Sequence, residues 1–481
     1  MNKLNWWSTS AILLLLCAAT AIALPAQTFI RAHSFDGADG RYPHAALVQA
    51  TDGNLYGTTE FGGAGGYGTV FRITPSGTLT TLYSFCPQTG CMDGENPYAG
   101  LVQATNGNLY GTTYGGGANG GGTIFKVTGS GTLTTLYSFC SQTGCTDGEN
   151  PYAGLVQATN GNLYGTTWGG GTNGRGTLFK ITPSDTLTTL YSFCSQSCCT
   201  DGENPYAGLV QATNGNLYGT TYGGGANGGG TIFKVTESGM LTTLYGFCSQ
   251  SGCTDGENPN VGLVQATDGS FYGATFNGGL SGAGTVFKVT SSGAVTTFYS
   301  FCSQSGCTDG SEPDGALVEA TNGSLYGTTS YLGASGDQGT AFEITLSGTL
   351  TTLYSFCSQR RCADGAGPVA TLVQDTNGNF YGTTGAGGDN NDGTVFSLSV
   401  GLGPFVETLP AGGKVGAPIK ILGSDLTGAT SVTFNGTPTT FTVEASSVIK
   451  ATVPAAATTG TVQVVTPSGT LSSNVPFRVA P

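Results

Sequence analysis

Two carboxylates interrupt a regular pattern and could carry acid–base chemistry. Seven copies of a similar segment follow one another along the chain, and six of them have Gln at one position of a predicted strand. The sixth copy instead has Glu319, and the seventh has Asp375 at the next position, where the other copies have Ala. Carboxyl groups on adjacent strands could act as the acid and base of a carbohydrate-active hydrolase or lyase. Because active sites are asymmetric, positions where the copies differ are the places to look for one.

A second group of candidate residues is aromatic and could bind sugar. These residues directly follow a recurring pentad of the type Leu-Tyr-Gly-Thr-Thr, and they are Tyr114, Trp168, Tyr222 and Phe276. The other copies have Glu60, Ser330 and Gly385 at this position. Exposed rings beside Gly-rich and Asn-rich loops could stack on the apolar faces of sugar rings. The alternative is that they cover the ends of hydrophobic cores, since aromatic side chains gain heavily from burial anywhere.

Acidic loops offer oxygen atoms that Ca²⁺ would accept. Asp147-Gly148-Glu149-Asn150 recurs with changes near Asp93, Asp201 and Asp255, and carboxylate and carbonyl oxygens are the ligands that calcium prefers. Asp and Asn also bond to nearby backbone groups in turns. We expect turn chemistry here, and no resident cofactor or metal.

Thirteen of the fourteen cysteines fall in six loops, and twelve of them form six pairs whose members are separated by four residues. We expect disulfides in an exported protein, whereas a zinc site would need four ligands in a chain with only two His. The expected pairs are Cys86–Cys91, Cys140–Cys145, Cys194–Cys199, Cys248–Cys253, Cys302–Cys307 and Cys357–Cys362, with Cys198 left over.

The N-terminal residues 1–26 have the pattern of a secretory signal peptide. Lys3 precedes a short apolar run, and small residues follow it as far as Ala26. No later stretch is long and apolar enough to span a bilayer. We therefore expect a secreted, periplasmic or cell-surface protein. Its net charge of −13 would repel a polyanion, so nucleic acid is not an expected partner.

The pentads that begin at Leu55, Leu109 and five later positions lie 54 or 55 residues apart. Each copy contains four strand-like runs, which in the second copy are Leu101–Thr105, Asn108–Thr113, Thr123–Thr128 and Thr132–Phe139. An Asn-Gly or Asp-Gly turn joins the first two runs. Four short antiparallel strands per repeat predict an all-β fold, a seven-bladed β-propeller over residues 27–400.

The two ends of the repeat array complement each other. The last copy lacks its fourth strand, and Ile30–Phe35 resembles that missing strand, so we expect the N-terminal segment to close the ring. The tight turns then lie on one face of the propeller, and the Gly-rich and Cys-containing loops lie on the other. We expect this long-loop face to be the functional surface, because binding residues are often carried by loops on a rigid scaffold.

The repeat Gly-Leu-Val-Gln-Ala-Thr-Asn-Gly-Asn-Leu-Tyr-Gly-Thr-Thr, followed by a Gly-rich loop, resembles the GloVer tandem repeat of exported bacterial proteins over about residues 28–400. That family brings no activity that can be carried over to a residue. After a linker at 401–404, residues 405–481 are similar to an IPT/TIG domain, with Gly-Ser-Asp-Leu and Val-Thr-Phe-Asn-Gly in order. This resemblance implies an immunoglobulin-like β-sandwich that serves as a spacer or interaction domain.

From these observations we expect a non-catalytic binding or surface-interaction protein. Its ligand would be polysaccharide or another extracellular partner, held by the long-loop face of the propeller. The alternative is a secreted hydrolase or lyase that uses Glu319 and Asp375.

Overall fold

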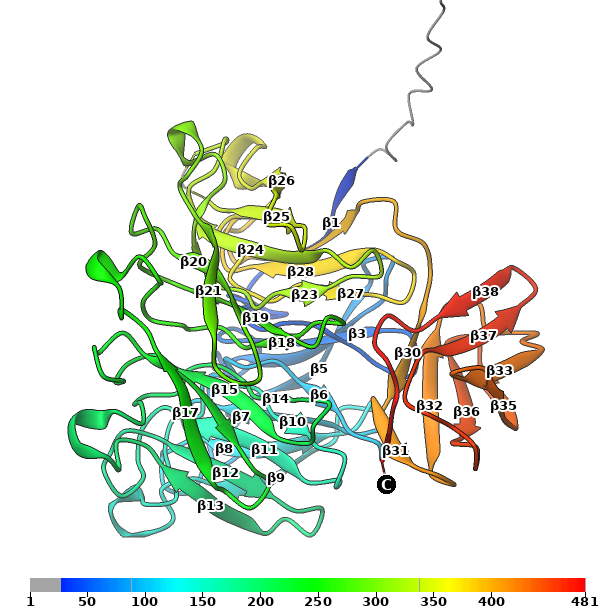
Figure 1. Cartoon of the computed structure of the whole chain (residues 1–481), viewed down its shortest axis with the longest axis horizontal. Helices are drawn as coiled ribbons and strands as arrows, with labels where there is room; N and C mark the ends of the chain where they lie inside the picture. The colour runs from blue at the N-terminus through cyan, green and yellow to red at the C-terminus, as the bar shows by residue number, and fades with distance from the viewer. Residues whose placement is uncertain (1–26, 88, 337, 481) are drawn as a thin grey trace, which may run out of the picture.

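A computed structural model describes residues 27–87, 89–336 and 338–480, so the predicted signal peptide lies outside the described residues. Each repeat forms one four-stranded antiparallel blade (Figure 1). In the second repeat the strands are β6 (Val102–Gln103), β7 (Leu109–Thr113), β8 (Thr123–Val127) and β9 (Leu133–Ser138). The inner strand is shorter than the predicted Leu101–Thr105, because the Ala104 N–H already bonds to the Asn108 carbonyl across the tight turn.

The other complete blades follow the same order from the inside outward. The first consists of β2 (Val48–Gln49), β3 (Leu55–Thr59), β4 (Thr69–Ile73) and β5 (Leu79–Ser84). The third consists of β10 (Val156–Gln157), β11 (Leu163–Thr167), β12 (Thr177–Ile181) and β13 (Leu187–Ser192). The fourth consists of β14 (Val210–Gln211), β15 (Leu217–Thr221), β16 (Thr231–Val235) and β17 (Leu241–Gly246), and the fifth of β18 (Val264–Gln265), β19 (Phe271–Thr275), β20 (Thr285–Val289) and β21 (Val295–Ser300).

The last two blades depart from this plan. The sixth contains β23 (Val318–Glu319), β24 (Leu325–Tyr331), β25 (Thr340–Ile344) and β26 (Leu350–Ser355), and β22 (Ser311–Pro313) adds a short pairing to β24. The seventh contains β27 (Val373–Gln374), β28 (Phe380–Thr384) and β29 (Thr394–Ser399). Its outer strand is β1 (Thr28–Ser34), which runs antiparallel to β29 from Thr28↔Ser399 to Ser34↔Thr394. The predicted closure of the ring by the N-terminal strand is confirmed.

Hydrophobic side chains fill the space between neighbouring blades. Tyr110 packs against a cluster that joins the second and third blades and includes Phe139 and Leu155. Gly111 is tightly enclosed, since a Cβ there would lie 2.6 Å from Cζ of Phe125 and 2.8 Å from Cδ2 of Leu101. The absence of a side chain at Gly111 makes room for side chains of its own blade.

The C-terminal domain is a β-sandwich with one continuous core. One sheet has the order β30 (Val406–Leu409), β32 (Pro418–Gly423), β36 (Val448–Thr452) and β35 (Phe441–Ala445). The other has the order β34 (Thr437–Pro438), β33 (Ser431–Phe434), β37 (Val462–Thr466) and β38 (Gly469–Ser472). A parallel pair, β31 (Gly412–Lys414) with β39 (Arg478–Ala480), completes the domain.

This domain packs directly against the tight-turn face of the propeller (Figure 1). Arg478 donates to the Thr213 carbonyl at 3.2 Å and to the Thr159 hydroxyl at 2.6 Å, and the Ser447 hydroxyl donates to the Thr51 carbonyl at 3.0 Å. The C-terminal domain is therefore docked on the propeller. Its expected role as a spacer or interaction domain stays a prediction. In the described part of the chain, no helix is both long and apolar enough to cross a membrane.

Candidate functional site

At their ends on the tight-turn face, which we call the lower ends, the inner strands are joined by a ring of nearly identical hydrogen bonds. We call it the lower ring. In each step, the backbone N–H of a Thr in one blade donates to a side-chain oxygen of the next blade, as from Thr105 to Gln157 at 2.9 Å. The last step joins the seventh blade to the first, from Thr376 to Gln49 at 3.0 Å. The same bond recurs between all seven pairs of neighbouring blades and ties each blade to the next. The glutamines are therefore part of the scaffold.

Glu319 takes the same place in this ring as the glutamines. Its carboxylate accepts from the Thr267 N–H at 2.9 and 3.1 Å and from the Thr267 hydroxyl at 2.7 Å. It also lines a cavity of about 420 Å³ between the propeller and the C-terminal domain. Asp375 is almost fully buried, and this burial raises its pKa to about 6. One of its oxygens accepts from the Asn377 N–H at 2.8 Å. The acid–base interpretation of these two residues stays a prediction, but the contacts of Glu319 are those of a structural group.

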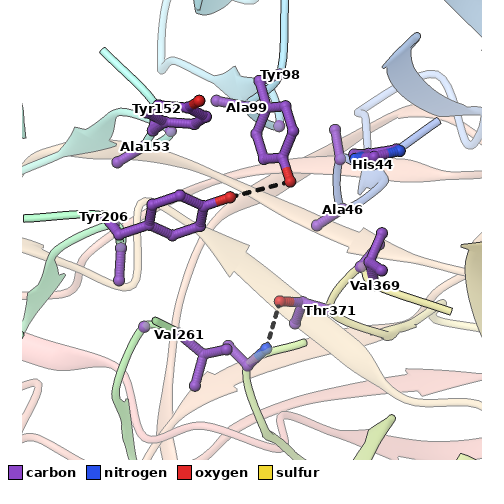
Figure 2. Close-up of a pocket in the computed structure, with 18 of the residues that line it drawn as sticks. His44, Ala46, Tyr98, Ala99, Tyr152, Ala153, Tyr206, Val261, Val369 and Thr371 are labelled. Atoms are coloured by element: carbon purple, nitrogen blue, oxygen red, sulfur yellow. Dashed lines mark hydrogen bonds between the residues drawn. The ribbon is translucent and has the colours of Figure 1, made fainter. Parts of the chain in front are cut away.

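At the opposite ends of the inner strands, on the long-loop face, lies a second ring of side chains whose residue type varies from blade to blade. We call these the upper ends. Each of the seven blades contributes the residue that directly follows a Pro. A cavity of about 240 Å³ opens inside this ring, at the mouth of the channel on the long-loop face (Figure 2). We call the ring the mouth ring, and its members are His44, Tyr98, Tyr152, Tyr206, Asn260, Asp314 and Val369.

Contacts between the Cys-containing loop and the neighbouring Gly-rich loop direct the chain into the channel at this ring. Asn150 adopts a left-handed φ of 55°, its side chain donates to the Tyr114 carbonyl at 3.0 Å, and its own carbonyl accepts from the Trp168 N–H at 3.0 Å. Asn tolerates this conformation better than most residues. Pro151 follows and lies over Gly122, where a Cβ would approach the Pro ring to 2.8 Å. The next residue, Tyr152, therefore enters the ring in a fixed position.

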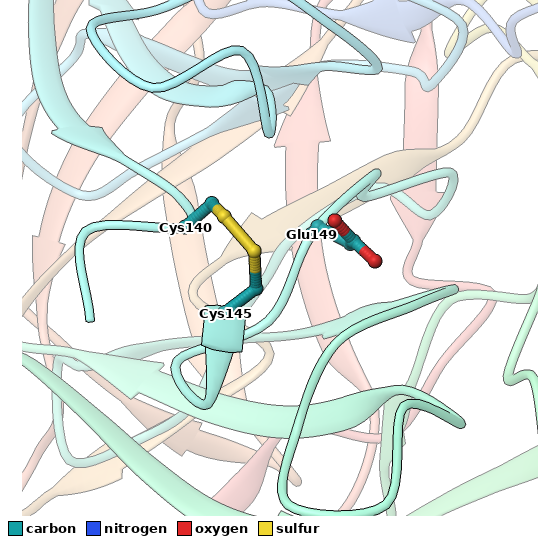
Figure 3. Close-up of side chains that lie close together, drawn as sticks. All are labelled: Cys140, Cys145 and Glu149. Carbon is teal, nitrogen blue, oxygen red and sulfur yellow. A yellow bond between two sulfur atoms is a disulfide. The ribbon is translucent and has the colours of Figure 1, made fainter. Parts of the chain in front are cut away.

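The Cys-containing loop that precedes this turn is held internally. Cys140 and Cys145 form a disulfide (Figure 3), and a short 3₁₀ turn, η1 (Thr143–Cys145), closes between them. Asp147 is fully buried and accepts hydrogen bonds from the Tyr137 hydroxyl, from Ser141 and from the Gln142 N–H at 2.7–3.2 Å. These bonds hold the pKa of its carboxyl below the usual value, against the effect of burial. Both carboxylate oxygens are thus used within the loop.

The other cysteine pairs repeat this arrangement. All six expected disulfides are present, and Cys198 is exposed and has no disulfide partner among the described residues. Four of these loops contain equivalent 3₁₀ turns, which are η2 (Ser197–Cys199), η3 (Ser251–Cys253), η4 (Ser305–Cys307) and η5 (Arg360–Cys362). Glu149 lies beside the sulfurs of Cys140 and Cys145 (Figure 3). Sulfurs that are joined in a disulfide are not the thiolates that bind zinc.

One half of the mouth ring is aromatic. Tyr98, Tyr152 and Tyr206 come from successive blades, and the Tyr206 hydroxyl donates to the Tyr98 hydroxyl at 3.0 Å (Figure 2). The Tyr152 and Tyr206 rings are stacked, with centroids 4.8 Å apart. Burial raises the pKa of all three hydroxyls. They therefore stay protonated at neutral pH and offer hydrogen bonds and ring faces to a ligand.

The other half of the ring is polar and contains unsatisfied atoms. Asn260 is 8% exposed, and its amide N–H donates to the Asp314 carboxylate. Its own Oδ1 is buried without a hydrogen-bond partner among the described residues, and so is Nδ1 of His44. Burial, and then repulsion from Glu312, raise the pKa of Asp314 to about 7, against the effect of the bond from Asn260. A buried acceptor without a donor costs about 1–3 kcal/mol, so these atoms are suited to a ligand that brings donors.

His44 and Glu60 complete the polar half. Burial lowers the pKa of His44 to about 4, so the imidazole is neutral at neutral pH. Its Nδ1 lies 3.9 Å from the Glu60 carboxylate, and burial raises the pKa of Glu60. The neutral imidazole packs edge-to-face on Tyr98, with centroids 5.1 Å apart. Polar and aromatic groups thus meet in one cavity.

The four aromatic residues that were predicted to bind sugar lie next to this ring rather than in it. Tyr114 packs on Tyr152 at 4.7 Å between centroids, and Trp168 contacts both Tyr152 and Tyr206 at 5.8 Å. Tyr222 also packs on Trp168 at 5.8 Å. Phe276 is half-buried on the same face, and no ring contact connects it to this cluster in the described residues. Three of the four therefore support the tyrosines of the mouth ring.

The mouth ring was missed in the sequence, although a signal for it was present. The residue after the repeated Pro changes from His44 through three tyrosines to Asn260 and Asp314, while its neighbours change little. These residues precede the inner strand, at the end of the long loop that leads into it. The residue type therefore differs among the seven equivalent positions, as it does at the position of Glu319.

Comparison with known proteins identifies the repeats and the C-terminal domain. The Gloeobacter/Verrucomicrobia repeat matches residues 19–199, 141–308 and 249–440, and the IPT/TIG domain matches residues 405–479. No curated protein matches the chain.

Solved propeller structures share the fold at low sequence identity. A streptogramin B lyase is 16% identical with a TM-score of 0.51, over 78% of this chain and 97% of the other. A fungal alcohol oxidase of the AA5 family in complex with copper is 12% identical with a TM-score of 0.52, over 94% and 99% of the two chains. At such identities the likeness concerns the fold alone. The repeat match, in contrast, spans most of the sequence, and the chain belongs to the Gloeobacter/Verrucomicrobia repeat family, with an IPT/TIG domain after its propeller.

Proposed function

We propose that this protein is an exported, non-catalytic binding protein that recognises polysaccharide at the mouth of the propeller channel. The observation that carries the proposal is the division of the mouth ring. Tyr98, Tyr152 and Tyr206 line one side of the cavity, and Asn260 and Asp314 lie in the other half of the ring. Pockets that combine aromatic walls with a few convergent polar groups are typical ligand sites.

Sugars have the complementary chemistry. A sugar ring has apolar C–H faces that stack on aromatic rings, and its hydroxyl groups can donate to buried acceptors. Asn260 Oδ1 is such an acceptor, and the buried Nδ1 of His44 accepts or donates according to the tautomer of its neutral imidazole. The Tyr98 and Tyr206 hydroxyls add further polar contacts at the same opening.

Export is part of the proposal and rests on separate observations. Residues 1–26 have the sequence pattern of a signal peptide. The chain also carries six disulfides, which persist in oxidising compartments. Secretion of the full-length chain into the medium or periplasm, with loss of the N-terminal residues, would be the direct check.

A glycan array with the intact mature protein tests the binding function. Tyr206→Ala removes a wall of the cavity, and Trp168→Ala removes the ring that supports it. Both should abolish or strongly reduce the signal. Tyr331→Ala is the matched control, because Tyr331 is an exposed aromatic residue at the end of β24 that does not line the cavity. Absence of glycan binding, or equal loss in the control, would refute the proposal.

A further inference from the structure

The cavity at the mouth ring has acidic groups around it and no cationic side chain in its lining. Asp314 lines the cavity, and neither Lys nor Arg is found among the described residues that do so. Glu60 lies 3.9 Å from His44 of the ring, and Glu312 is close enough to Asp314 to repel its charge. No ion pair within 4.0 Å neutralises Asp314 in the described part of the chain. The site therefore lacks positive charge.

Asp314 and Asn260 form a prepared hydrogen-bonding pair at this point. The Asn260 amide is used on the Asp314 carboxylate, which leaves the buried Asn260 Oδ1 as an acceptor with no donor. The raised pKa of Asp314 reflects the same lack of compensation. An ammonium group carries three donors and a positive charge. It could bond to both oxygens at once and would stabilise the ionised carboxylate.

The aromatic half of the ring is compatible with such a group. The faces of Tyr rings attract cations, and the attraction strengthens where water is excluded. Tyr98 and Tyr206 line the same cavity as Asp314, and the Asp314 charge also acts on both of their hydroxyls. Carboxylate and aromatic faces together favour a cationic ligand over a neutral one.

We infer that the ligand is an amino sugar with a free amine, bound with its ammonium group at Asp314 and Asn260 and its ring against the tyrosines. This inference rests on the proposed function and makes it more specific. It excludes acidic polysaccharides, which the carboxylates and the net charge of −13 would repel.

Calorimetric titration of the mature full-length protein with three matched β-1,4-linked oligosaccharides tests the inference. They are oligomers of glucosamine, N-acetylglucosamine and glucose of equal length, which differ at one substituent of each ring. The wild-type protein should bind the glucosamine oligomer at least about tenfold more tightly, a difference of about 1.4 kcal/mol. Raising the salt concentration should reduce this preference.

Asp314→Asn is the decisive variant. It removes the charge and keeps the shape, and the new amide oxygen can still accept from Asn260. The preference for glucosamine, measured as the ratio of its affinity to that of the glucose oligomer in the same protein, should fall to about twofold or less. A wild-type protein without the preference, or a preference that survives Asp314→Asn, would overturn the inference.

The outcomes also separate the inference from the proposed function. Equal binding of all three oligomers, lost in Tyr206→Ala, would sustain polysaccharide recognition and refute the amine. If none of the three binds and the glycan array is also empty, the proposed function fails and the inference fails with it.

Discussion

The two ends of the same seven inner strands differ in their chemistry. At the lower end, six glutamines and Glu319 accept hydrogen bonds from seven threonine N–H groups and join every blade to the next. At the upper end, the mouth ring has five different residue types at its seven positions. The residue types are uniform at the lower end, where each copy must satisfy the same backbone geometry. They vary at the upper end, where the copies need not satisfy that geometry and can form an asymmetric site.

This difference also reassigns Glu319. It looks like a functional exception because it replaces Gln, yet its contacts to Thr267 repeat those of the glutamines. Asp314 belongs to a position that varies throughout, and there the change has brought a half-buried carboxyl with a raised pKa. Perturbed titration of this kind concentrates at functional sites.

Removal of β1 should have the largest effect, because both rings depend on closure. Without Thr28–Ser34 the seventh blade would lose its outer strand, and β29 would become an exposed edge. We expect the deletion to abolish a cooperative unfolding transition or to lower stability by more than about 5 kcal/mol, a large part of the total for a typical protein. Calorimetry of the mature protein would measure it. An unchanged transition would mean that the ring does not need this strand.

Disruption of the lower ring should affect stability and leave binding intact. Gln103→Leu would leave the Thr51 N–H and the Gly107 carbonyl without their side-chain partner. We expect a loss of about 1–3 kcal/mol, seen as a lower thermal midpoint, with unchanged glycan affinity. Gln103→Glu is the control, because it keeps the acceptor for Thr51 and should cost less. A loss of glycan affinity in Gln103→Leu at a temperature where it remains folded would contradict the claim that the lower ring serves stability and the mouth ring serves binding.

In the mouth ring, Asp314→Asn should remove a pH dependence of stability. Folded Asp314 has a pKa of about 7, above its ordinary value of 3.8, so it retains a proton that the unfolded chain releases. The contribution of Asp314 to wild-type stability should therefore fall as pH rises from about 4 to about 7, by on the order of 1–3 kcal/mol, and stay level above that range.

The comparison of wild type and Asp314→Asn isolates this effect. His44 has a lowered pKa and contributes the opposite slope between about 4 and 6.5, but it does so in both proteins. Denaturant unfolding at a series of pH values should show the variant gaining relative to wild type as pH rises. Parallel curves would show that Asp314 titrates normally.

Glu319→Gln should have the smallest effect. It restores the residue that the other six blades carry, so stability should change by less than about 0.5 kcal/mol or rise slightly. Combined with Asp375→Asn, it also tests the catalytic alternative. If the wild-type protein degrades a polysaccharide and the double variant does not, Glu319 and Asp375 have a role beyond the scaffold.

Much of this architecture could be predicted, because the 54-residue period reports it directly. The Asn-Gly turns fixed the strand order, and the incomplete last repeat indicated that Ile30–Phe35 closes the ring. The site was harder to predict. The raised pKa of Asp314 arises only when folding of the surrounding blades buries it, and Tyr98 meets Tyr206 across two repeat lengths of sequence. Such contacts depend on closure of the ring and have no local sequence pattern.

The most direct test of the account compares the two ends of the inner strands in one experiment. Tyr152→Ala with Tyr206→Ala alters the mouth ring, and Gln103→Leu alters the lower ring. Thermal unfolding and affinity for the tightest-binding oligosaccharide are measured for both. We predict that the tyrosine variant loses at least about thirtyfold in affinity, about 2 kcal/mol, and stays folded, while the glutamine variant loses stability and keeps its affinity. Unchanged affinity in the folded tyrosine variant would contradict the assignment of the mouth ring as the binding site.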